Sequence, residues 1–363
     1  MLRQNLLVVG QSGAGKTNLF YNLALQLSQE KIPFWIFDFK QDFRHLLNYR
    51  EDLIVLPLEK LKFNPLRPPE NVSPLRWIQI FCDVFGDSQA LLSGSKNFLL
   101  SHLHQLFKVY SVFEDEENNF PSMHEFAEMM HYKSFPLQTK EARYLETTMN
   151  RIKASVLTLG ETFDCSKGLP LKKLLNRNVV FELEGISSDF QNFLVEILLA
   201  WVYHYRMAQG SRTELKHAIF FDEAKRIFDK NKEKRYEAGV PLIDLITSRT
   251  REFGEALIVA DQEASKLTDS VKANTYTKIM LASGSGKDIN EMAEAMGLSE
   301  KQKETSFELD SGEGIVKVSG VDPFPVKFPL IPINKNISKE EVLLSSESKL
   351  KKFKNEVKDR KQP

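Results

Sequence analysis

Residues 10–17 constrain this chain more than any other feature, because GQSGAGKT is a complete G-x-x-x-x-G-K-[ST] motif. An apolar run precedes the motif at residues 6–9, and an amphipathic stretch follows it at residues 18–29. This order predicts a strand, a loop and a helix, in which glycines let backbone N–H groups turn toward phosphate oxygens at the helix amino end. The residues expected to cradle phosphate are Gly10, Gln11, Ser12, Gly13, Ala14, Gly15, Lys16 and Thr17.

Two side chains of this phosphate loop have distinct expected roles. Lys16 is expected to reach the β- and γ-phosphates of a nucleotide, and Thr17 to ligate Mg²⁺ through its hydroxyl. ATP and Mg²⁺ are therefore the predicted cofactors. A glycine-rich turn without a ligand is the alternative interpretation, but the flanking strand and helix patterns favour nucleotide binding.

Composition sets the class of protein and leaves its ligands open. The 363 residues, 42% of them hydrophobic, suffice for one large α/β domain or two smaller ones. Because 49 basic residues balance 49 acidic ones, nucleic-acid binding has to use local patches. The two cysteines, Cys82 and Cys165, lie far apart, which favours a reducing compartment over disulfides or zinc. No apolar run reaches the roughly 18 residues that span a bilayer, so a cytoplasmic protein without membrane contacts is expected.

Strand and helix patterns alternate in two blocks, which predicts a parallel sheet sandwiched by helices. Between the blocks, apolar residues recur at helical spacing with almost no strand signal, and we expect an all-helical insertion there. The last residues hold nine basic against five acidic side chains and are expected to form a frayed helix or a mobile arm. The expected divisions are a core first part at 1–64, the insertion at 65–175, a core second part at 176–334 and a charged tail at 335–363.

Polar side chains follow two further predicted strands. The apolar run 218–221 ends in Asp222 and Glu223. At the edge of the sheet that carries the phosphate loop, Asp222 would hold Mg²⁺ through water and Glu223 would polarise the attacking water. The strand at 256–260 ends in Asp261 and Gln262, and the Gln262 amide is expected to sense the γ-phosphate. Solvated turns are the alternative at both places.

Arginines precede the strand that ends in Gln262. Arg249 and Arg251 stand in the segment SRTREFG, at a helix-to-strand junction. Guanidinium groups placed there can cross a subunit boundary and stabilise transition-state charge on a neighbour's ATP. Ordinary surface arginines are the alternative.

With these elements in order, the chain resembles the HerA/FtsK-type ATPases, the motor branch that includes HerA helicase-translocases and conjugative coupling proteins. The matching segments are GQSGAGKT at 10–17, FDFK at 37–40, KFNPL at 62–66, FFDEA at 220–224, SRTREFGEALIVADQ at 248–262 and GEGIVKVSGVDPFPVKFP at 312–329. Two departures stand out. HerA proteins usually carry an N-terminal β-barrel before the phosphate loop, and Thr rather than Asp261 commonly precedes the sensor Gln.

The resemblance implies a RecA-like core assembled as a ring of six, with ATP at each subunit interface. It assigns Glu223 as catalytic base, Gln262 as sensor and Arg251 as the finger acting on a neighbouring subunit, with Arg249 as the alternative finger. It also places Lys16 and Thr17 on phosphate and Mg²⁺, with Asp222 on Mg²⁺.

A basic cluster follows the acidic pair and is the best candidate for DNA contacts, because affinity for DNA comes mainly from phosphate neutralisation. Its members are Lys225, Arg226, Lys230, Lys232, Lys234 and Arg235. Asp229 and Glu233 dilute the cluster, and a solvated face is the alternative. Lys266 and Lys272 are further candidates.

The function that these expectations favour is a hexameric, ATP-driven DNA translocase or helicase motor, working with a nuclease or other effector and binding DNA without sequence preference. One alternative is an ATP-dependent ring that acts as scaffold or switch in a defence complex. Another is a conjugative coupling or secretion ATPase. A small-molecule kinase is less favoured, because the acidic pair and Gln262 suit water activation.

Overall fold

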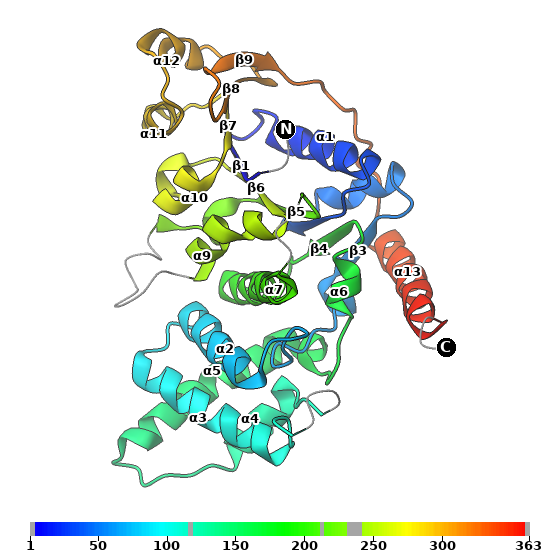
Figure 1. Cartoon of the computed structure of the whole chain (residues 1–363), viewed down its shortest axis with the longest axis vertical. Helices are drawn as coiled ribbons and strands as arrows, with labels where there is room; N and C mark the ends of the chain where they lie inside the picture. Colours follow the sequence, from blue (N-terminus) through cyan, green and yellow to red (C-terminus); the bar gives the residue numbers. More distant parts are fainter. Residues whose placement is uncertain (1–3, 115–118, 211–213, 231–241, 360–363) are drawn as a thin grey trace. The chain divides into compact units, whose positions relative to one another are not determined.

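The computed structural model describes residues 4–114, 119–210, 214–230 and 242–359 (Figure 1). The chain forms two compact units. Unit 1 comprises Met1–Pro57, Leu171–Glu184 and Arg212–Pro363, and unit 2 comprises Leu58–Pro170 and Gly185–Ser211. The candidate phosphate loop, the acidic pair and Gln262 all belong to unit 1.

Unit 1 is built on one nine-stranded sheet in the order β3-β4-β2-β5-β6-β1-β7-β8-β9. Its strands are β1 (Leu6–Val9), β2 (Phe34–Asp38), β3 (Ile54–Pro57), β4 (Val179–Glu182), β5 (His217–Asp222), β6 (Glu255–Asp261), β7 (Thr277–Leu281), β8 (Glu313–Val318) and β9 (Phe324–Lys327). Strands β1 to β7 are mutually parallel, as predicted, and are buried throughout. At one edge of the sheet β8 and β9 run antiparallel, so the sheet is mixed and mostly parallel. The connection at residues 319–323 is too short for the crossover that a parallel pair needs.

Helix α1 (Lys16–Gln29) covers one face of this sheet with an apolar stripe. Phe20 packs edge-on against Phe220 of β5, with ring centroids 5.2 Å apart, in the same core cluster as Val8 of β1 and Ile36 of β2. This packing fixes the start of α1, and with it Lys16, against the carboxyl ends of the central strands. The other helices of unit 1 are α6 (Leu171–Leu174), α9 (Leu242–Arg249), α10 (Asp269–Asn274), α11 (Gly286–Met296), α12 (Glu300–Ser306) and α13 (Lys339–Asp359).

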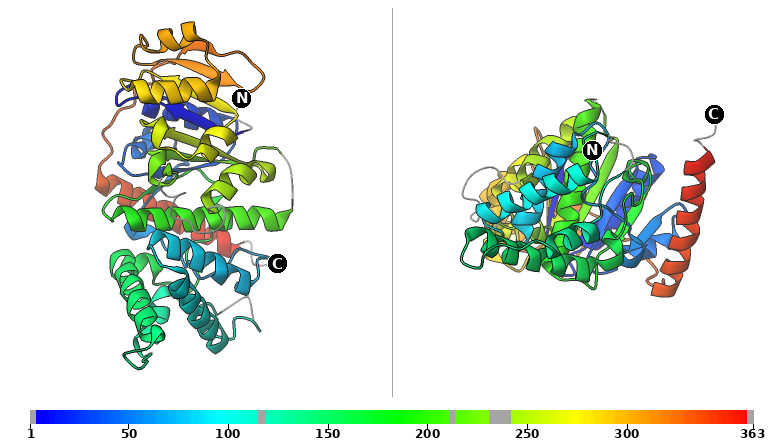
Figure 2. Two further views of the ribbon diagram at one scale, coloured as in Figure 1. Left: turned by 90° about the vertical axis from the view of Figure 1, so that its left-hand side faces the viewer. Right: turned by 90° about the horizontal axis from the view of Figure 1, so that it is seen from below.

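Of the two expectations for the charged tail, a frayed helix or a mobile arm, the structure shows a helix, and this helix is packed against the core instead of frayed along its length. Residues 339–359 form α13, which packs beside β3 (Figures 1 and 2). Val342, Leu350 and Phe353 are buried, and their spacing of eight and eleven residues places them on one helical face. The many lysines of the tail obscured this stripe in the sequence, which is why its packing was not predicted.

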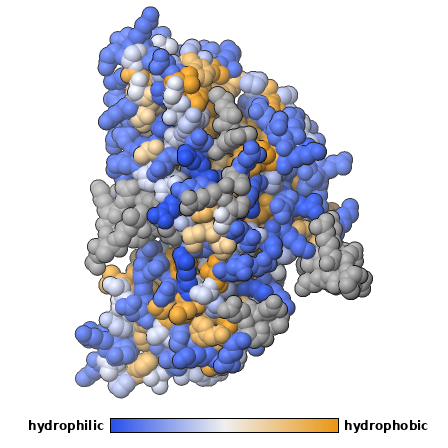
Figure 3. All heavy atoms as spheres, viewed as in Figure 1, coloured by the Kyte–Doolittle hydropathy of each residue, from blue (hydrophilic) through white to orange (hydrophobic). Residues whose placement is uncertain are grey.

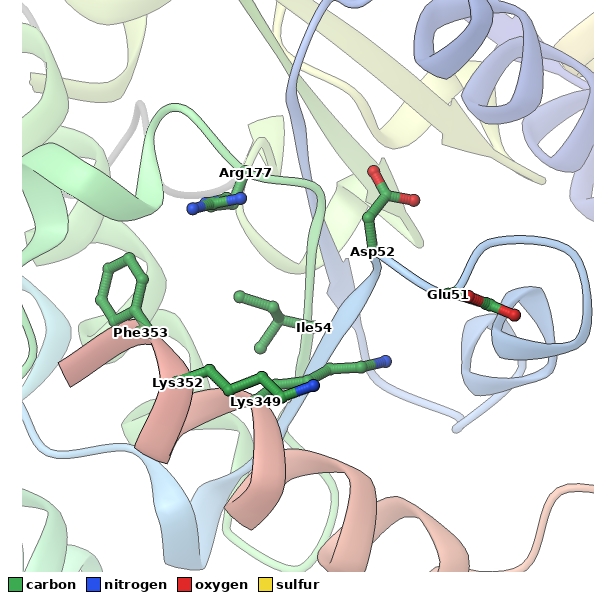
Figure 4. Close-up of a pocket in the computed structure, with 7 residues that line it drawn as sticks. All are labelled: Glu51, Asp52, Ile54, Arg177, Lys349, Lys352 and Phe353. Carbon is green, nitrogen blue, oxygen red and sulfur yellow. The ribbon is translucent and has the colours of Figure 1, made fainter. Parts of the chain in front are cut away.

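Hydrogen bonds from α13 reach the backbone of β3 and of the residue before it. The Lys349 ammonium donates to the carbonyl of Leu53 at 2.7 Å, and the Ser346 hydroxyl donates to the carbonyl of Val55. Beside these contacts lies a small pocket of about 190 Å³ with charged and apolar walls (Figure 4). Its lining residues are Glu51, Asp52, Ile54, Arg177, Lys349, Lys352 and Phe353.

Unit 2 is helical in the part that the structure describes, and its core is aromatic. The helices are α2 (Pro74–Ser88), α3 (Ser93–Val109), α4 (Met123–His131), α5 (Lys140–Phe163) and α7 (Ser188–Gln209). Ser73 caps α2 and Pro74 begins it, a common pairing at helix starts. Phe81 and Phe85 of α2 pack on Phe193 of α7. Helix α7 therefore groups with unit 2, although it follows the boundary at residue 175 that the sequence suggested.

No helix in the described ranges combines the length and the apolar character needed to cross a bilayer. The face of the molecule in Figure 3 carries mainly hydrophilic residues, with apolar residues in small groups between them.

Candidate nucleotide-binding site

The phosphate loop has a backbone shape that only glycine adopts without strain at key positions. Gly15, which immediately precedes α1, has φ +106°, in the region where side chains are disfavoured. At Gly10, an added Cβ would lie 2.8 Å from the Cβ of Leu281 on β7. The glycines of the motif are therefore required by this fold, and the loop ends where the amino end of α1 begins.

Lys16 folds back over the loop that precedes it. Its side chain is buried, and its ammonium donates to the carbonyls of Gly10 and Gln11 at 2.7 and 2.8 Å. Burial lowers the pKa of Lys16, and the nearby carboxylates of Asp222 and Asp261 oppose that shift. The lysine is thus already positioned beside the carboxylates that the sequence expected at this site.

Three neighbouring strands end in aspartates at the edge of the sheet that carries the phosphate loop. Asp38 ends β2, Asp222 ends β5 and Asp261 ends β6, and all three are buried. Burial raises the pKa of Asp222 to about 6, although Lys40 and Lys16 favour its charged form. Carboxyl ends of parallel strands are where open α/β sheets place their ligands.

Asp38 and Asp261 shape the loops that follow their strands. Asp38 accepts the N–H groups of Lys40 at 3.0 Å and Phe43 at 2.8 Å, and burial raises its pKa to about 7. Asp261 accepts the N–H groups of Lys225 at 2.6 Å and Gln262 at 2.7 Å. These two carboxylates therefore position the segments that carry Lys40, Gln262 and the start of the basic cluster.

Glu223 is held in an unusual conformation between two cations. Its φ of +66° and ψ of 53° lie in the left-handed region, which costs a non-glycine residue about 1–3 kcal/mol. One carboxylate oxygen, Oε1, pairs with the Lys40 ammonium, and the other, Oε2, pairs with Nε of Arg226. Burial alone would raise the pKa of Glu223, but these two hydrogen bonds outweigh it and hold the pKa below its ordinary value.

The predicted sensor lies at the same edge of the sheet and the predicted fingers do not. Gln262 directly follows β6, beside Asp261. Arg251 lies in the short 3-10 helix η4 (Thr250–Phe253) before β6, and its Nη1 donates to Oε1 of Gln4, which precedes β1. That contact therefore lies at the amino ends of the strands, about 23 Å along the seven residues of β6 from the loop. Arg249, the last residue of α9, is exposed.

Only half of the predicted basic cluster falls within the described residues. Lys232, Lys234 and Arg235 lie outside them. Lys225 pairs with Glu263 at 2.7 Å, Lys230 pairs with Asp269 at 3.1 Å, and Arg226 pairs with Glu223. Each described member thus has a carboxylate partner, as do the further candidates Lys266 and Lys272.

A contact that sequence reasoning missed joins the phosphate loop to the segment before β8. The Ser311 hydroxyl donates to the carbonyl of Gly13 at 2.7 Å, and the N–H of Gly312 donates to the carbonyl of Ala14 at 3.1 Å. Further along, Asn18 of α1 donates to the carbonyl of Pro329 at 2.8 Å. These partners lie 298 to 311 residues apart in the chain, and no local sequence pattern indicates such a pairing.

The side chains present fit a magnesium ion shared with a bound nucleotide. Among the described residues, no group of three or more His, Cys, Asp or Glu side chains is arranged to hold a metal alone. Mg²⁺ at nucleotide sites uses one or two protein ligands together with phosphate oxygens and water. Thr17, the second residue of α1, and the buried Asp222 are the pair that would hold such an ion.

Comparisons with known proteins identify the fold. No protein-family model matches the chain, and no curated protein matches its sequence. Among solved structures, VirB4 of Thermoanaerobacter pseudethanolicus is similar, with a TM-score of 0.72 and 18% identity over 90% of each chain. The conjugative coupling protein TrwB is also similar. Its complex with ADP and Mg²⁺ has a TM-score of 0.65 and 13% identity over 93% of this chain and 88% of TrwB. The chain therefore has the RecA-like P-loop ATPase fold of these proteins.

Proposed function

We propose that this protein is an ATP-hydrolysing motor of the HerA/FtsK type that moves along DNA. The observation that carries the proposal is the meeting of a complete phosphate loop with the strand-end carboxylates Asp222 and Glu223 and with Gln262. Water-activating acids beside a phosphate loop suit hydrolysis better than transfer to a substrate hydroxyl. The likeness to TrwB, solved with ADP and Mg²⁺, agrees with this chemistry.

In the proposed reaction, residues 10–17 cradle the phosphates with backbone N–H groups. Lys16 exchanges the loop carbonyls for the β- and γ-phosphates. Thr17 and Asp222 would hold Mg²⁺, which would supply positive charge to the phosphates. Glu223 orients a water and accepts its proton as the water oxygen bonds to the γ-phosphorus and the bond to ADP breaks. Gln262 senses the loss of the γ-phosphate.

We further propose a ring of six subunits in which Arg251, or alternatively Arg249, acts on the ATP of a neighbour. Arg251 lies beside Gln4 at the amino ends of the strands, whereas the phosphate loop lies at their carboxyl ends. Arg251 therefore cannot reach the phosphate loop of its own chain, which supports a role at the ATP of a neighbour. Mixing Lys16→Ala with Arg251→Ala subunits is expected to restore part of the activity at hybrid interfaces. A complete failure to complement would argue against a role of Arg251 at the ATP of a neighbouring subunit.

DNA is the proposed substrate along which the motor moves. The basic cluster contacts the backbone phosphates of the DNA, so binding has no sequence preference. A nuclease or other effector is the proposed partner.

The second candidate function is a conjugative coupling or secretion ATPase, and the likeness to TrwB and VirB4 favours it specifically. Directional movement on duplex DNA in a single-molecule assay supports a motor, whereas hydrolysis without movement supports a scaffold.

The deciding experiment is Glu223→Gln in the full chain. ATP binding is expected to persist while turnover falls by about 10²–10⁴-fold, the usual contribution of a general base. Glu161→Gln, an exposed glutamate of unit 2, is the matched control and should leave turnover unchanged. Unchanged hydrolysis in Glu223→Gln would show that Glu223 is not the catalytic base. Mass measurement with nucleotide, with and without duplex DNA, tests the ring and its ligand together.

A further inference from the structure

The carboxylate of Glu223 is engaged on both sides at once. Lys40, two residues after β2, holds Oε1, and Arg226, in the 3-10 helix η3 (Ala224–Arg226), holds Oε2 with its Nε 2.5 Å away. The Arg226 guanidinium also lies over the ring of Phe39, 5.0 Å from its centroid. Glu223 is therefore clamped by side chains from two separate strand ends.

This arrangement has a consequence for the proposed reaction. A base must offer an oxygen lone pair within hydrogen-bond distance of the water that it orients, and it must take up the proton of that water. A cation on each oxygen fixes the orientation of the Glu223 carboxylate and, despite burial, lowers its pKa, so the paired carboxylate is a weaker base than one that has lost a cation. Because its backbone is already fixed in the left-handed conformation, loss of one cation would free an oxygen without rebuilding the loop.

Of the two cations, Arg226 is the one that a nucleic acid can withdraw. It belongs to the proposed DNA-contacting cluster, between Lys225 and Lys230. Its side chain is 32% exposed, so solvent reaches it. The Lys40 side chain is 46% exposed, so membership of the basic cluster and the guanidinium group, not exposure, distinguish Arg226. A guanidinium binds phosphate oxygens bidentately as readily as it binds a carboxylate, so a backbone phosphate competes directly with Glu223.

We propose that Arg226 is a positioning residue that couples nucleic-acid binding to hydrolysis. Without nucleic acid it holds Oε2 of Glu223. When its guanidinium binds a backbone phosphate, that oxygen is released to orient water, while Lys40 keeps the other oxygen in place. The inference rests on the proposed function, since it assumes that Glu223 is the base.

The test measures steady-state ATP hydrolysis by the full chain, with and without duplex DNA of mixed sequence. Arg226→Gln is expected to raise the DNA-free kcat by about threefold or more, with little change in KM for ATP, and to abolish stimulation by DNA. Arg226→Lys restores a single cation and should recover part of the DNA dependence. Arg50→Gln is the matched control, because Arg50 is 31% exposed and also pairs with a carboxylate, that of Asp52.

The outcomes distinguish a failure of the proposed function from a failure of the coupling role of Arg226. If Glu223→Gln hydrolyses ATP normally, the proposed function fails. If Glu223→Gln is inactive but Arg226→Gln keeps the wild-type DNA-free rate and the wild-type stimulation, only the coupling role is overturned. A wild-type rate that DNA does not change, or a DNA-free rate that falls in both Arg226 variants while thermal unfolding is unchanged, overturns it as well.

Discussion

Two glutamates stand at the carboxyl edge of the same sheet, on either side of β2, and their surroundings differ sharply. Glu182 ends β4, and Arg44 holds both of its oxygens, at 2.7 and 2.8 Å. These two side chains are 3% and 7% exposed. Glu223 follows β5, is 15% exposed, and divides its oxygens between Lys40 and Arg226.

The difference lies in how many partners share each carboxylate and what can reach them. The Arg44 fork satisfies Glu182 completely and is sealed from water, so no ligand can replace it. Arg226 is within reach of solvent and holds only one oxygen of Glu223. The same pair of residue types therefore makes a fixed structural link at β4 and an exchangeable one at β5. Solvent access, more than residue identity, separates the pair of Arg44 and Glu182 from the pair of Arg226 and Glu223.

The largest expected effect is on the sealed pair. Arg44→Ala leaves Glu182 buried without a partner and should reduce the free energy of unfolding by about 3–5 kcal/mol. Urea denaturation followed by circular dichroism measures the change. A loss below about 1 kcal/mol would mean that water reaches Glu182, and the contrast with Glu223 would then break down.

The strand between the two glutamates offers a pH test. Burial raises the pKa of Asp38 to about 7 from an ordinary value of 3.8, and Glu182, its register partner on β4, adds to the shift. Between these values the folded protein keeps a proton that the unfolded chain has lost, so stability falls as pH rises from about 4 to about 7.

Asp38→Asn removes that contribution, which amounts at most to about 1.4 kcal/mol per pH unit. Denaturation midpoints measured across this range should decline less steeply in the variant than in the wild type. Parallel slopes in the two proteins would show that Asp38 titrates alike in the folded and unfolded chain.

A double substitution sharpens the comparison. In Arg44→Met with Glu182→Leu, both charges of the sealed pair are replaced by apolar side chains of similar size. Buried ion pairs are often no more stabilising than such replacements, so unfolding free energy should return to within about 1 kcal/mol of the wild type. A double variant as unstable as Arg44→Ala would show that the pair has a packing role beyond charge compensation.

The smallest expected effect on stability is at the exchangeable pair. Arg226→Ala should change the free energy of unfolding by no more than about 1 kcal/mol, because partly exposed ion pairs contribute little. The same denaturation assay applies. A loss as large as that of Arg44→Ala would place Arg226 among structural residues and erase the distinction from Glu182.

Local patterns carried the sequence predictions that the structure confirms. The strand before the phosphate loop, the helix after it and the strands that end in Asp222 and Asp261 are each encoded within a few adjacent residues. The order of strands in the sheet is not, since it depends on which buried faces meet. The antiparallel edge and the packing of α13 escaped prediction for the same reason.

The candidate site divides in the same way. Its residue types were visible in the sequence, but the partners of Glu223 were not. The sequence predicted Arg226 only as a member of the basic cluster. It predicted no function for Lys40, which follows β2. Only the fold brings the ends of β2 and β5 together. The roles of the site residues stay predictions, namely those of Lys16, Thr17, Asp222, Glu223, Gln262, Arg249 and Arg251.

Helix α13 is also expected to affect how this molecule behaves toward copies of itself. β3 is the outermost strand on its side of the sheet, and α13 side chains occupy the carbonyls of Leu53 and Val55. A bare strand at such a margin recruits strands from other molecules. The lysine-rich helix thus prevents β3 from pairing with strands of other molecules. Protein shortened before residue 339 should aggregate at concentrations where the intact chain stays dispersed.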